Sequence, residues 1–104
     1  MKRFIIIITT CASKKEAQNI IRTLLEKRLI ACANIIGGVE SEFWWKGRID
    51  TAKEFLIMIK TQAKHFKAIE KIITRLHSYD VPELIAVPII AGSKKYLKWI
   101  ESIK

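Results

Sequence analysis

The side chains that could bind a soft or borderline metal ion in this sequence are Met1, Cys11, Cys32, Met58, His65 and His77. Thiolate, thioether and imidazole groups are the ligands that copper and zinc prefer. These residues are widely separated along the chain, whereas a structural zinc site requires four ligands held together. We therefore expect no structural metal site within one subunit, no required cofactor, and no need for metal in folding.

His77 is the strongest candidate for a metal ligand. In a symmetric oligomer, His77 of one subunit could approach thiol or acidic groups of the next. Copper(II) binds most tightly of the divalent first-row metals, so we predict weak, copper-preferring and pH-dependent binding that involves His77. The alternative is structural, because a protonated histidine in the last turn of a helix interacts favourably with the helix dipole. His65 lies in a mostly polar stretch and is predicted to be on the surface.

The two cysteines, Cys11 and Cys32, are predicted to be reduced and structural. They form no close-spaced pair and no disulfide-rich pattern. Cys32 lies in a predicted strand and is expected to be buried. No Ser-His-Asp or Cys-His arrangement is evident in the sequence, so we predict no catalytic residues and no enzymatic activity.

The chain carries a formal net charge of +9, which suggests an acidic partner or nucleic acid. Its basic residues are, however, spread along the whole sequence. The ordered stripe among them consists of Lys64, Lys67, Lys71 and Arg75. The opposite face of the same predicted helix is apolar, which is typical of an amphipathic helix with a solvated basic face.

The elements that must position these residues alternate between strands and helices. The run "RFIIIITT" predicts a strand buried on both faces. The capping-box pattern of Ser13 and Glu16 predicts a helix from Lys14 to Arg28. A strand then starts near Ala31, is interrupted at residues 37–38, and reaches Trp45. The turn "WKGR" and the strand "RIDTAKEFLIMIKT" follow. A helix is predicted over 64–77, then the strand "LIAVPII", and then a short helix capped by Ser93.

This β-α-β-β-α-β order predicts an α+β fold: a ferredoxin-like sandwich with an antiparallel sheet, a long hairpin and an extra C-terminal helix. We expect one domain over residues 1–104 and the strand order 4-1-3-2. Pro88 lacks an N–H and therefore belongs in an edge strand. Trp44 and Trp45 are adjacent in the other edge strand and must point to opposite faces. An exposed apolar edge needs a partner, so we predict a subunit interface at Trp44, Trp45 and Gly47.

Three functional classes share this fold, and the sequence argues against each. A metallochaperone needs Cys-x-x-Cys after the first strand, but the residue three after Cys11 is Lys14. An acylphosphatase needs an arginine loop there to cradle phosphate, and "TTCASKK" has none. An RNA-recognition motif needs outward-facing aromatics on the central strands, which here are mainly aliphatic. A nucleic-acid-binding domain is nevertheless the main alternative, because the chain is basic.

The segments "EKRLIACANI", "WWKGRI", "MIKT", "LHSYDVPE" and "YLKW" occur in this order and spacing. Together they resemble the CutA divalent-cation-tolerance family over essentially the whole chain. The resemblance implies a compact homotrimer in which the long hairpins pair with neighbouring subunits, similar in architecture to the PII signalling proteins. It also implies copper tolerance and copper binding, with no established reaction. Ser78 stands where family members commonly have proline.

Polar residues inside these motifs lie at the ends of the predicted elements: Cys32, Lys60, Thr61, Tyr79 and Glu83. We predict that they line a ligand-binding or inter-subunit cleft. Alternatively, they satisfy backbone groups and trimer contacts. No apolar run is long enough to cross a bilayer, so we expect no membrane partner and a cytoplasmic location.

Overall fold

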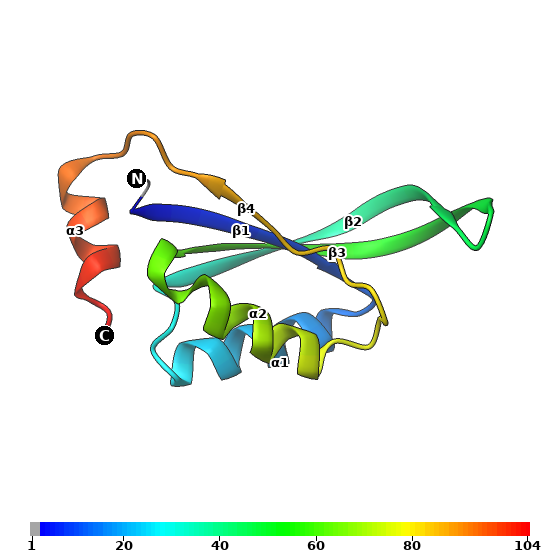
Figure 1. Cartoon of the computed structure of the whole chain (residues 1–104), viewed down its shortest axis with the longest axis horizontal. Helices are drawn as coiled ribbons and strands as arrows, with labels where there is room; N and C mark the ends of the chain where they lie inside the picture. Colours follow the sequence, from blue (N-terminus) through cyan, green and yellow to red (C-terminus); the bar gives the residue numbers. More distant parts are fainter. Residues whose placement is uncertain (1–2) are drawn as a thin grey trace.

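The computed structural model describes residues 3–104 and contains a four-stranded sheet with helices on one of its faces (Figure 1). The elements in chain order are β1 (Phe4–Cys11), α1 (Lys14–Glu26), β2 (Cys32–Trp45), β3 (Arg48–Gln62), the 3-10 turn η1 (Ala63–His65), α2 (Phe66–Leu76), β4 (Ile85–Pro88) and α3 (Lys94–Ser102). The predicted α+β ferredoxin-like order and the additional C-terminal helix are both confirmed.

The strand order is β2-β3-β1-β4, and every neighbouring pair is antiparallel. It is the predicted 4-1-3-2 order read from the other edge. Ile7 of β1 pairs with Ile59 of β3 on one side and with Ala86 of β4 on the other. Pro88 lies at the end of the edge strand β4, where its missing N–H interrupts no ladder.

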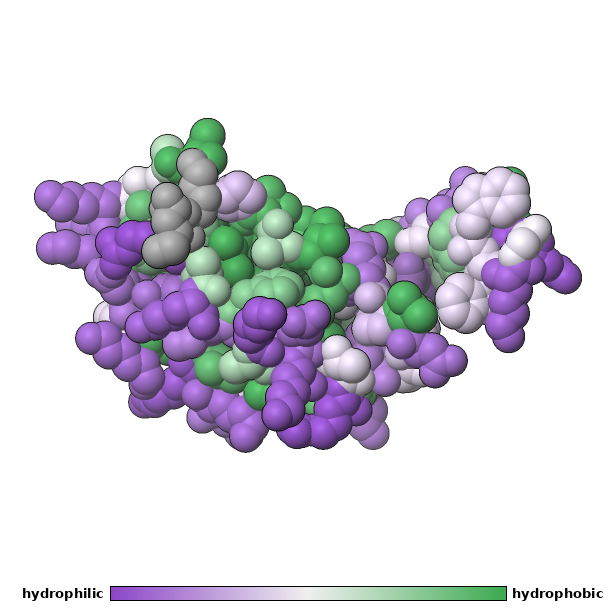
Figure 2. Space-filling model, viewed as in Figure 1, coloured by the Kyte–Doolittle hydropathy of each residue, from purple (hydrophilic) through white to green (hydrophobic). Residues whose placement is uncertain are grey.

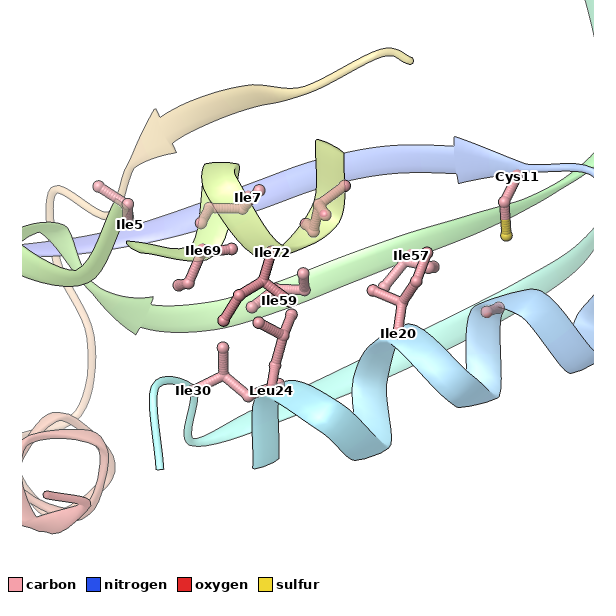
Figure 3. Close-up of a cluster of buried hydrophobic side chains, with 12 residues drawn as sticks. Ile5, Ile7, Cys11, Ile20, Leu24, Ile30, Ile57, Ile59, Ile69 and Ile72 are labelled. Atoms are coloured by element: carbon pink, nitrogen blue, oxygen red, sulfur yellow. The ribbon is translucent and has the colours of Figure 1, made fainter. Parts of the chain in front are cut away.

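The hydrophobic core lies between the sheet and the two helices α1 and α2 (Figure 3). Alternate residues of β1 and β3, such as Ile7, Ile57 and Ile59, face the helices and are fully buried. Ile20 and Leu24 of α1 pack against them at helical spacing, as do Ile69 and Ile73 of α2. The sequence therefore buries isoleucine on one face of each central strand, and this burial fixes the register.

The other face of the sheet has no helix over its centre. Most of the residues of β1, β3 and β4 that point to this face are apolar, among them Ile6, Ile8, Leu56, Met58, Ile85 and Val87. Both Ile85 and Val87 are exposed in the isolated subunit. Figure 2 shows a hydrophobic area over β1 and β4 in this part of the molecule. We call this surface the open face of the sheet.

The hairpin of β2 and β3 projects well beyond the helices (Figure 1). Its ladder is interrupted between Ile36 and Val39, where Gly38 has a φ of 72°, so the interruption predicted at residues 37–38 is present as a shift in the strand register. The two-residue turn has a positive φ at Lys46 (51°) and at Gly47 (78°), which is the type I′ pattern. This turn twists in the same sense as the strands and therefore allows a long, regular hairpin.

The clearest differences from the predictions lie at two helix boundaries and at one cap. Helix α1 ends at Glu26, and Arg28, which was expected to be helical, has a φ of 57°. The predicted helix over 64–77 begins as the 3-10 turn η1, so Lys64 precedes α2. Ser13 caps α1 through its hydroxyl, but Glu16 does not complete the capping box, because its carboxylate binds Ser78 instead. A long-range contact has replaced the local one.

Candidate functional site

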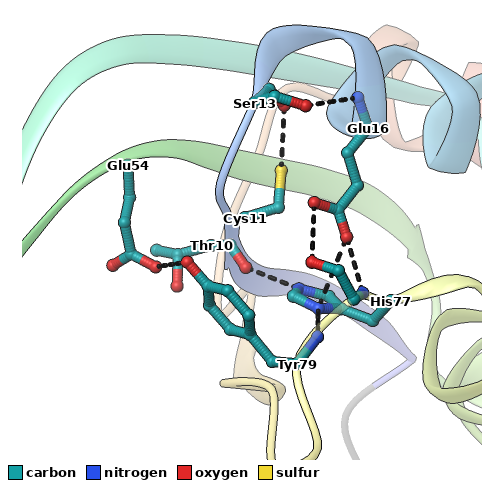
Figure 4. A network of polar contacts seen from close by, with 8 residues as sticks. Thr10, Cys11, Ser13, Glu16, Glu54, His77 and Tyr79 are labelled. Atoms are coloured by element: carbon teal, nitrogen blue, oxygen red, sulfur yellow. Dashed lines mark hydrogen bonds and ion pairs between the residues drawn. The ribbon is translucent and has the colours of Figure 1, made fainter.

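His77 lies at the centre of a buried polar network where β1, α1 and the end of α2 meet (Figure 4). It is the C-cap residue of α2, and its side chain is fully buried. The backbone N–H of Tyr79 donates to Nδ1 over 3.1 Å, so Nε2 carries the proton and donates to the carbonyl of Thr10 over 2.7 Å. Both ring nitrogens therefore have partners within the subunit.

Glu16 connects the beginning of α1 to the segment after α2. Its carboxylate accepts the backbone N–H of Ser78 at 2.8 Å and the Ser78 hydroxyl at 3.1 Å. It also lies 3.6 Å from Nδ1 of His77, close enough for an ion pair if the imidazole is protonated. A proline at position 78 would offer neither donor, so Ser78 makes a contact that the usual family residue does not allow.

Tyr79 extends the network to the hairpin. Its hydroxyl donates to Glu54 over 2.8 Å, and its ring lies 4.8 Å from the ring of His77. Glu54 is only 6% exposed, although it is charged and sits in a strand. Burial and the hydrogen bond to Glu54 raise the pKa of Tyr79 to about 12, so the hydroxyl keeps its proton at neutral pH. This contact fixes the base of the hairpin to the loop after α2.

Cys11 lies beside this network but is chemically inert. It is fully buried, and its thiol donates weakly to the carbonyl of Ser13 over 3.5 Å. Burial and the nearby charge of Glu16 raise the pKa of the Cys11 thiol to about 11. Since the thiolate is the reactive and metal-binding form, Cys11 fits the predicted structural role.

A second group of polar residues lies on the open face, at the opposite end of β3. Cys32 and Lys60 pair across β2 and β3, and the ammonium of Lys60 donates to the side-chain carbonyl of Asn34. The Cys32 thiol contacts the hydroxyl of Tyr96 in α3 at 3.4 Å. This contact and burial raise the pKa of Tyr96. Cys32 was expected to be buried but is only half-buried.

The five residues predicted to line one cleft therefore do not meet in one subunit. Cys32 and Lys60 lie about 20 Å along β3 from the position of Glu54 and Tyr79, at roughly 3.3 Å per residue. Thr61 points to the helix side, is 2% exposed, and donates to the carbonyl of Leu29. Glu83 is exposed in the loop before β4. The alternation of a strand explains the separation of Lys60 from Thr61, since adjacent side chains face opposite ways.

The sequence-based reasoning missed Glu16, Glu54 and Tyr96 as site residues. Glu54 could have been noticed as a carboxylate that directly precedes the apolar run "FLIMI". His65, predicted to be on the surface, is half-buried, and its Nε2 has no partner among residues 3–104. Burial and Lys64 lower the pKa of His65.

The described residues do not form a metal site within one subunit. Among residues 3–104, no three histidine, cysteine or carboxylate side chains converge on a common point. Met1, one of the candidate thioether ligands, lies outside the described residues. A metal ion at His77 would have to displace either Thr10 or Tyr79 from the ring and draw further ligands from a second subunit.

The open face also bears on the nucleic-acid alternative. Its central positions on β1 and β3 are aliphatic, and Phe55 packs against the core on the helix side. The face therefore lacks the pair of outward-facing aromatics on which RNA bases stack. No helix in the described part of the chain is long and apolar enough to span a membrane.

Comparisons with known proteins identify the family and agree with the fold described above. The family model described as CutA1 divalent ion tolerance protein matches residues 5–103. The divalent-cation tolerance protein CutA of Archaeoglobus fulgidus is 42% identical over 101 residues, covering 97% of this chain and 96% of that protein. Human protein CutA is 40% identical over 94 residues, covering 90% of this chain but 52% of that protein. The chain spans about half the length of the rice, mouse and human relatives.

Solved structures show the same fold. The structure of the periplasmic divalent cation tolerance protein CutA from Archaeoglobus fulgidus has a TM-score of 0.94 at 39% identity, covering 96% of this chain and 97% of that one. The crystal structure of CutA1 from Oryza sativa has a TM-score of 0.92 at 36% identity, covering 96% of this chain and 92% of that one.

Proposed function

The chain belongs to the CutA1 divalent ion tolerance family, and from this premise we propose that it supports tolerance of divalent cations, copper among them, as a non-enzymatic homotrimer. The names of its relatives describe a tolerance and no reaction. Within the subunit, the buried thiol of Cys11 and the fully engaged ring of His77 offer no ready nucleophile or base. An activity abolished by changing either residue in a folded variant would contradict the non-enzymatic assignment.

The observation that supports the trimer is the combination of an apolar open face with an exposed aromatic hairpin. Trp44 is 72% exposed and Trp45 is 41% exposed, and they pair with Ile49 and Arg48 on opposite faces of the hairpin. A subunit with this much apolar surface on a sheet and its edge favours association with copies of itself. A closed threefold ring would cover the open face and both aromatic faces without leaving free edges.

The assembly is tested by analytical ultracentrifugation at micromolar concentration. We expect a trimer for the natural chain and a smaller species, or markedly lower stability, for the Trp44→Ser/Trp45→Ser variant. The matched control, Lys67→Ser/Lys71→Ser on the outer face of α2, should remain trimeric. A monomeric natural chain would refute the proposal.

For metal, we propose weak copper binding that involves His77, completed by ligands from an adjacent subunit. Only neutral imidazole binds the ion, so acidification should release it. Calorimetric titration of copper into the natural chain, His77→Ala and the control His65→Ala should show weakening in His77→Ala alone. Equal affinity in all three would exclude His77, and no binding to the natural chain would make tolerance an indirect effect.

A signalling role similar to that of PII proteins would reconcile tolerance with weak metal binding, and we propose it as the mode of action. In that case the hairpin and the trimer clefts contact a partner protein, and copper tolerance is its cellular consequence. We also propose a cytoplasmic location, which cell fractionation would test, since the related archaeal protein is described as periplasmic.

A further inference from the structure

A cavity of about 730 Å³ opens between α3, the residue that precedes β1, and the passage from β3 into η1. Its lining residues are Arg3, Gln62, Ala63, Lys64, Lys98, Glu101, Ser102 and Lys104. Four of them are basic and one is acidic. The volume lies within the range of roughly 300–1,000 Å³ typical of small-molecule sites. Figure 2 shows hydrophilic side chains gathered over this α3 end of the molecule.

The walls of the cavity are held in place by contacts from three segments of the chain. The backbone N–H of Ala63 donates to the carbonyl of Arg3 over 2.8 Å, which joins the turn after β3 to the segment before β1. The guanidinium of Arg3 pairs with Glu101 in α3 and lies 5.3 Å from the ring centroid of Phe4. Ile100, which is 1% exposed, anchors α3 in the core beside them.

Pairing with Glu101 neutralises Arg3 and leaves an excess of positive charge. Among residues 3–104, neither Lys64 nor Lys98 pairs with a carboxylate. In a concave surface such charges repel one another at close range, and a bound anion would relieve that repulsion. Lys64 was predicted to continue the basic stripe of α2, but it lies in η1 and faces this cavity instead.

Gln62 provides a second and independent indication of a polar ligand. Its side chain lines the cavity and is only 7% exposed. No other described residue forms a hydrogen bond with its amide. Its amide is not among the buried unpaired polar atoms, so it is open to the cavity, and an amide NH₂ group is a suitable donor to an anionic oxygen.

We propose that this cavity binds a compact, multiply charged anion with two or more phosphate groups. Several lysine ammonium groups around one hollow provide point charges that suit phosphate, and a single carboxylate would match only one of them. Glu101 limits the affinity by holding Arg3 away from the anion. The site lies at the α3 end of the molecule and is separate from the network around His77.

The test is calorimetric titration of inorganic tripolyphosphate into the full chain. We expect Lys64→Gln/Lys98→Gln to weaken binding roughly tenfold or more, because two charge-assisted contacts are lost. The control Lys67→Gln/Lys71→Gln removes the same net charge from the outer face of α2 and should leave the affinity nearly unchanged. Glu101→Gln should strengthen binding, since it frees Arg3.

Two results of these titrations would overturn the proposal. Equal weakening in the cavity variant and in the α2 control would show that the anion responds only to net charge. No binding of tripolyphosphate to the natural chain would exclude the site directly. A single-stranded oligonucleotide should compete only weakly with tripolyphosphate. Strong competition that also depends on Lys67 and Lys71 would indicate a nucleic-acid surface instead.

Discussion

Tyr79→Phe is the most informative single change in the polar network, because it deletes one oxygen and leaves the ring in place. Its hydroxyl is the hydrogen-bond donor that contacts Glu54, which is 6% exposed. Removing a partner from a buried charged group costs about 1.5–3 kcal/mol, more than an ordinary hydrogen bond, because the carboxylate stays desolvated. We expect the free energy of unfolding to fall by that amount.

The assay is urea denaturation of the natural chain and the variant at equal protein concentration and neutral pH, followed by tryptophan fluorescence. Glu54→Gln serves as the companion change, since the amide oxygen can still accept from Tyr79 without a buried charge. The double variant completes a thermodynamic cycle, and residues in direct contact should show a coupling of roughly 0.5–3 kcal/mol. A loss below about 0.5 kcal/mol in Tyr79→Phe, the range of ordinary surface changes, would refute the reasoning.

The same contact predicts a dependence on alkaline pH. The pKa of Tyr79 rises from 10.0 to about 12 in the folded chain, so folding favours the protonated phenol. Its contribution is fully present below pH 10, the unfolded value, and is lost as the pH rises toward 12. Tyr96, whose pKa is also raised, contributes in the same direction. Tyr79→Phe should therefore reduce the loss of stability between pH 10.0 and about 12. If the free energy of unfolding falls equally steeply with pH in the variant, the loss comes from Tyr96 or from lysine deprotonation instead.

Three other predictions follow from the packing and the proposed assembly. Glu16→Ala should cost about 1.5–3 kcal/mol in urea denaturation, because it removes both hydrogen bonds to Ser78, whereas Ser13→Ala should cost only about 1 kcal/mol as a lost N-cap. Equal losses would mean that the contact with Ser78 contributes little. Ile57→Ala, at a fully buried position, should cost about 2–5 kcal/mol, and a value near zero would contradict the described core. The melting temperature of the natural chain should be high and should rise with protein concentration, which scanning calorimetry at several concentrations would show.

The elements were predictable because each has a local signal. The run Ile5 to Ile8, the cap at Ser13, the turn at Gly47 and the misfit of Pro88 in a central strand each identify an element or its position. Together these signals determined the order of the sheet. A local pattern failed where a tertiary contact overrode it, since the Glu16 carboxylate binds Ser78 instead of completing the capping box.

The site was less predictable because its contacts join residues far apart in the sequence. The imidazole of His77 meets Thr10 across the fold, and Tyr79 meets Glu54. Helical spacing placed His77 at the end of a helix but could not show whether its nitrogens were free. Similarly, the alternation of β3 assigns Lys60 and Thr61 to opposite faces, but shared membership of a motif suggested that they act together.

The central position of β1 has a consequence for how the chain folds during synthesis. Its partners, β3 and β4, both come much later in the sequence, since Ile7 pairs with Ile59 and Ala86. The β2–β3 hairpin, by contrast, closes through a two-residue turn and can form early. The isoleucine-rich β1 segment therefore remains unpaired and exposed until most of the chain has emerged from the ribosome. Non-local pairing of this kind slows folding, so β1 is the segment that a chaperone would need to protect from aggregation.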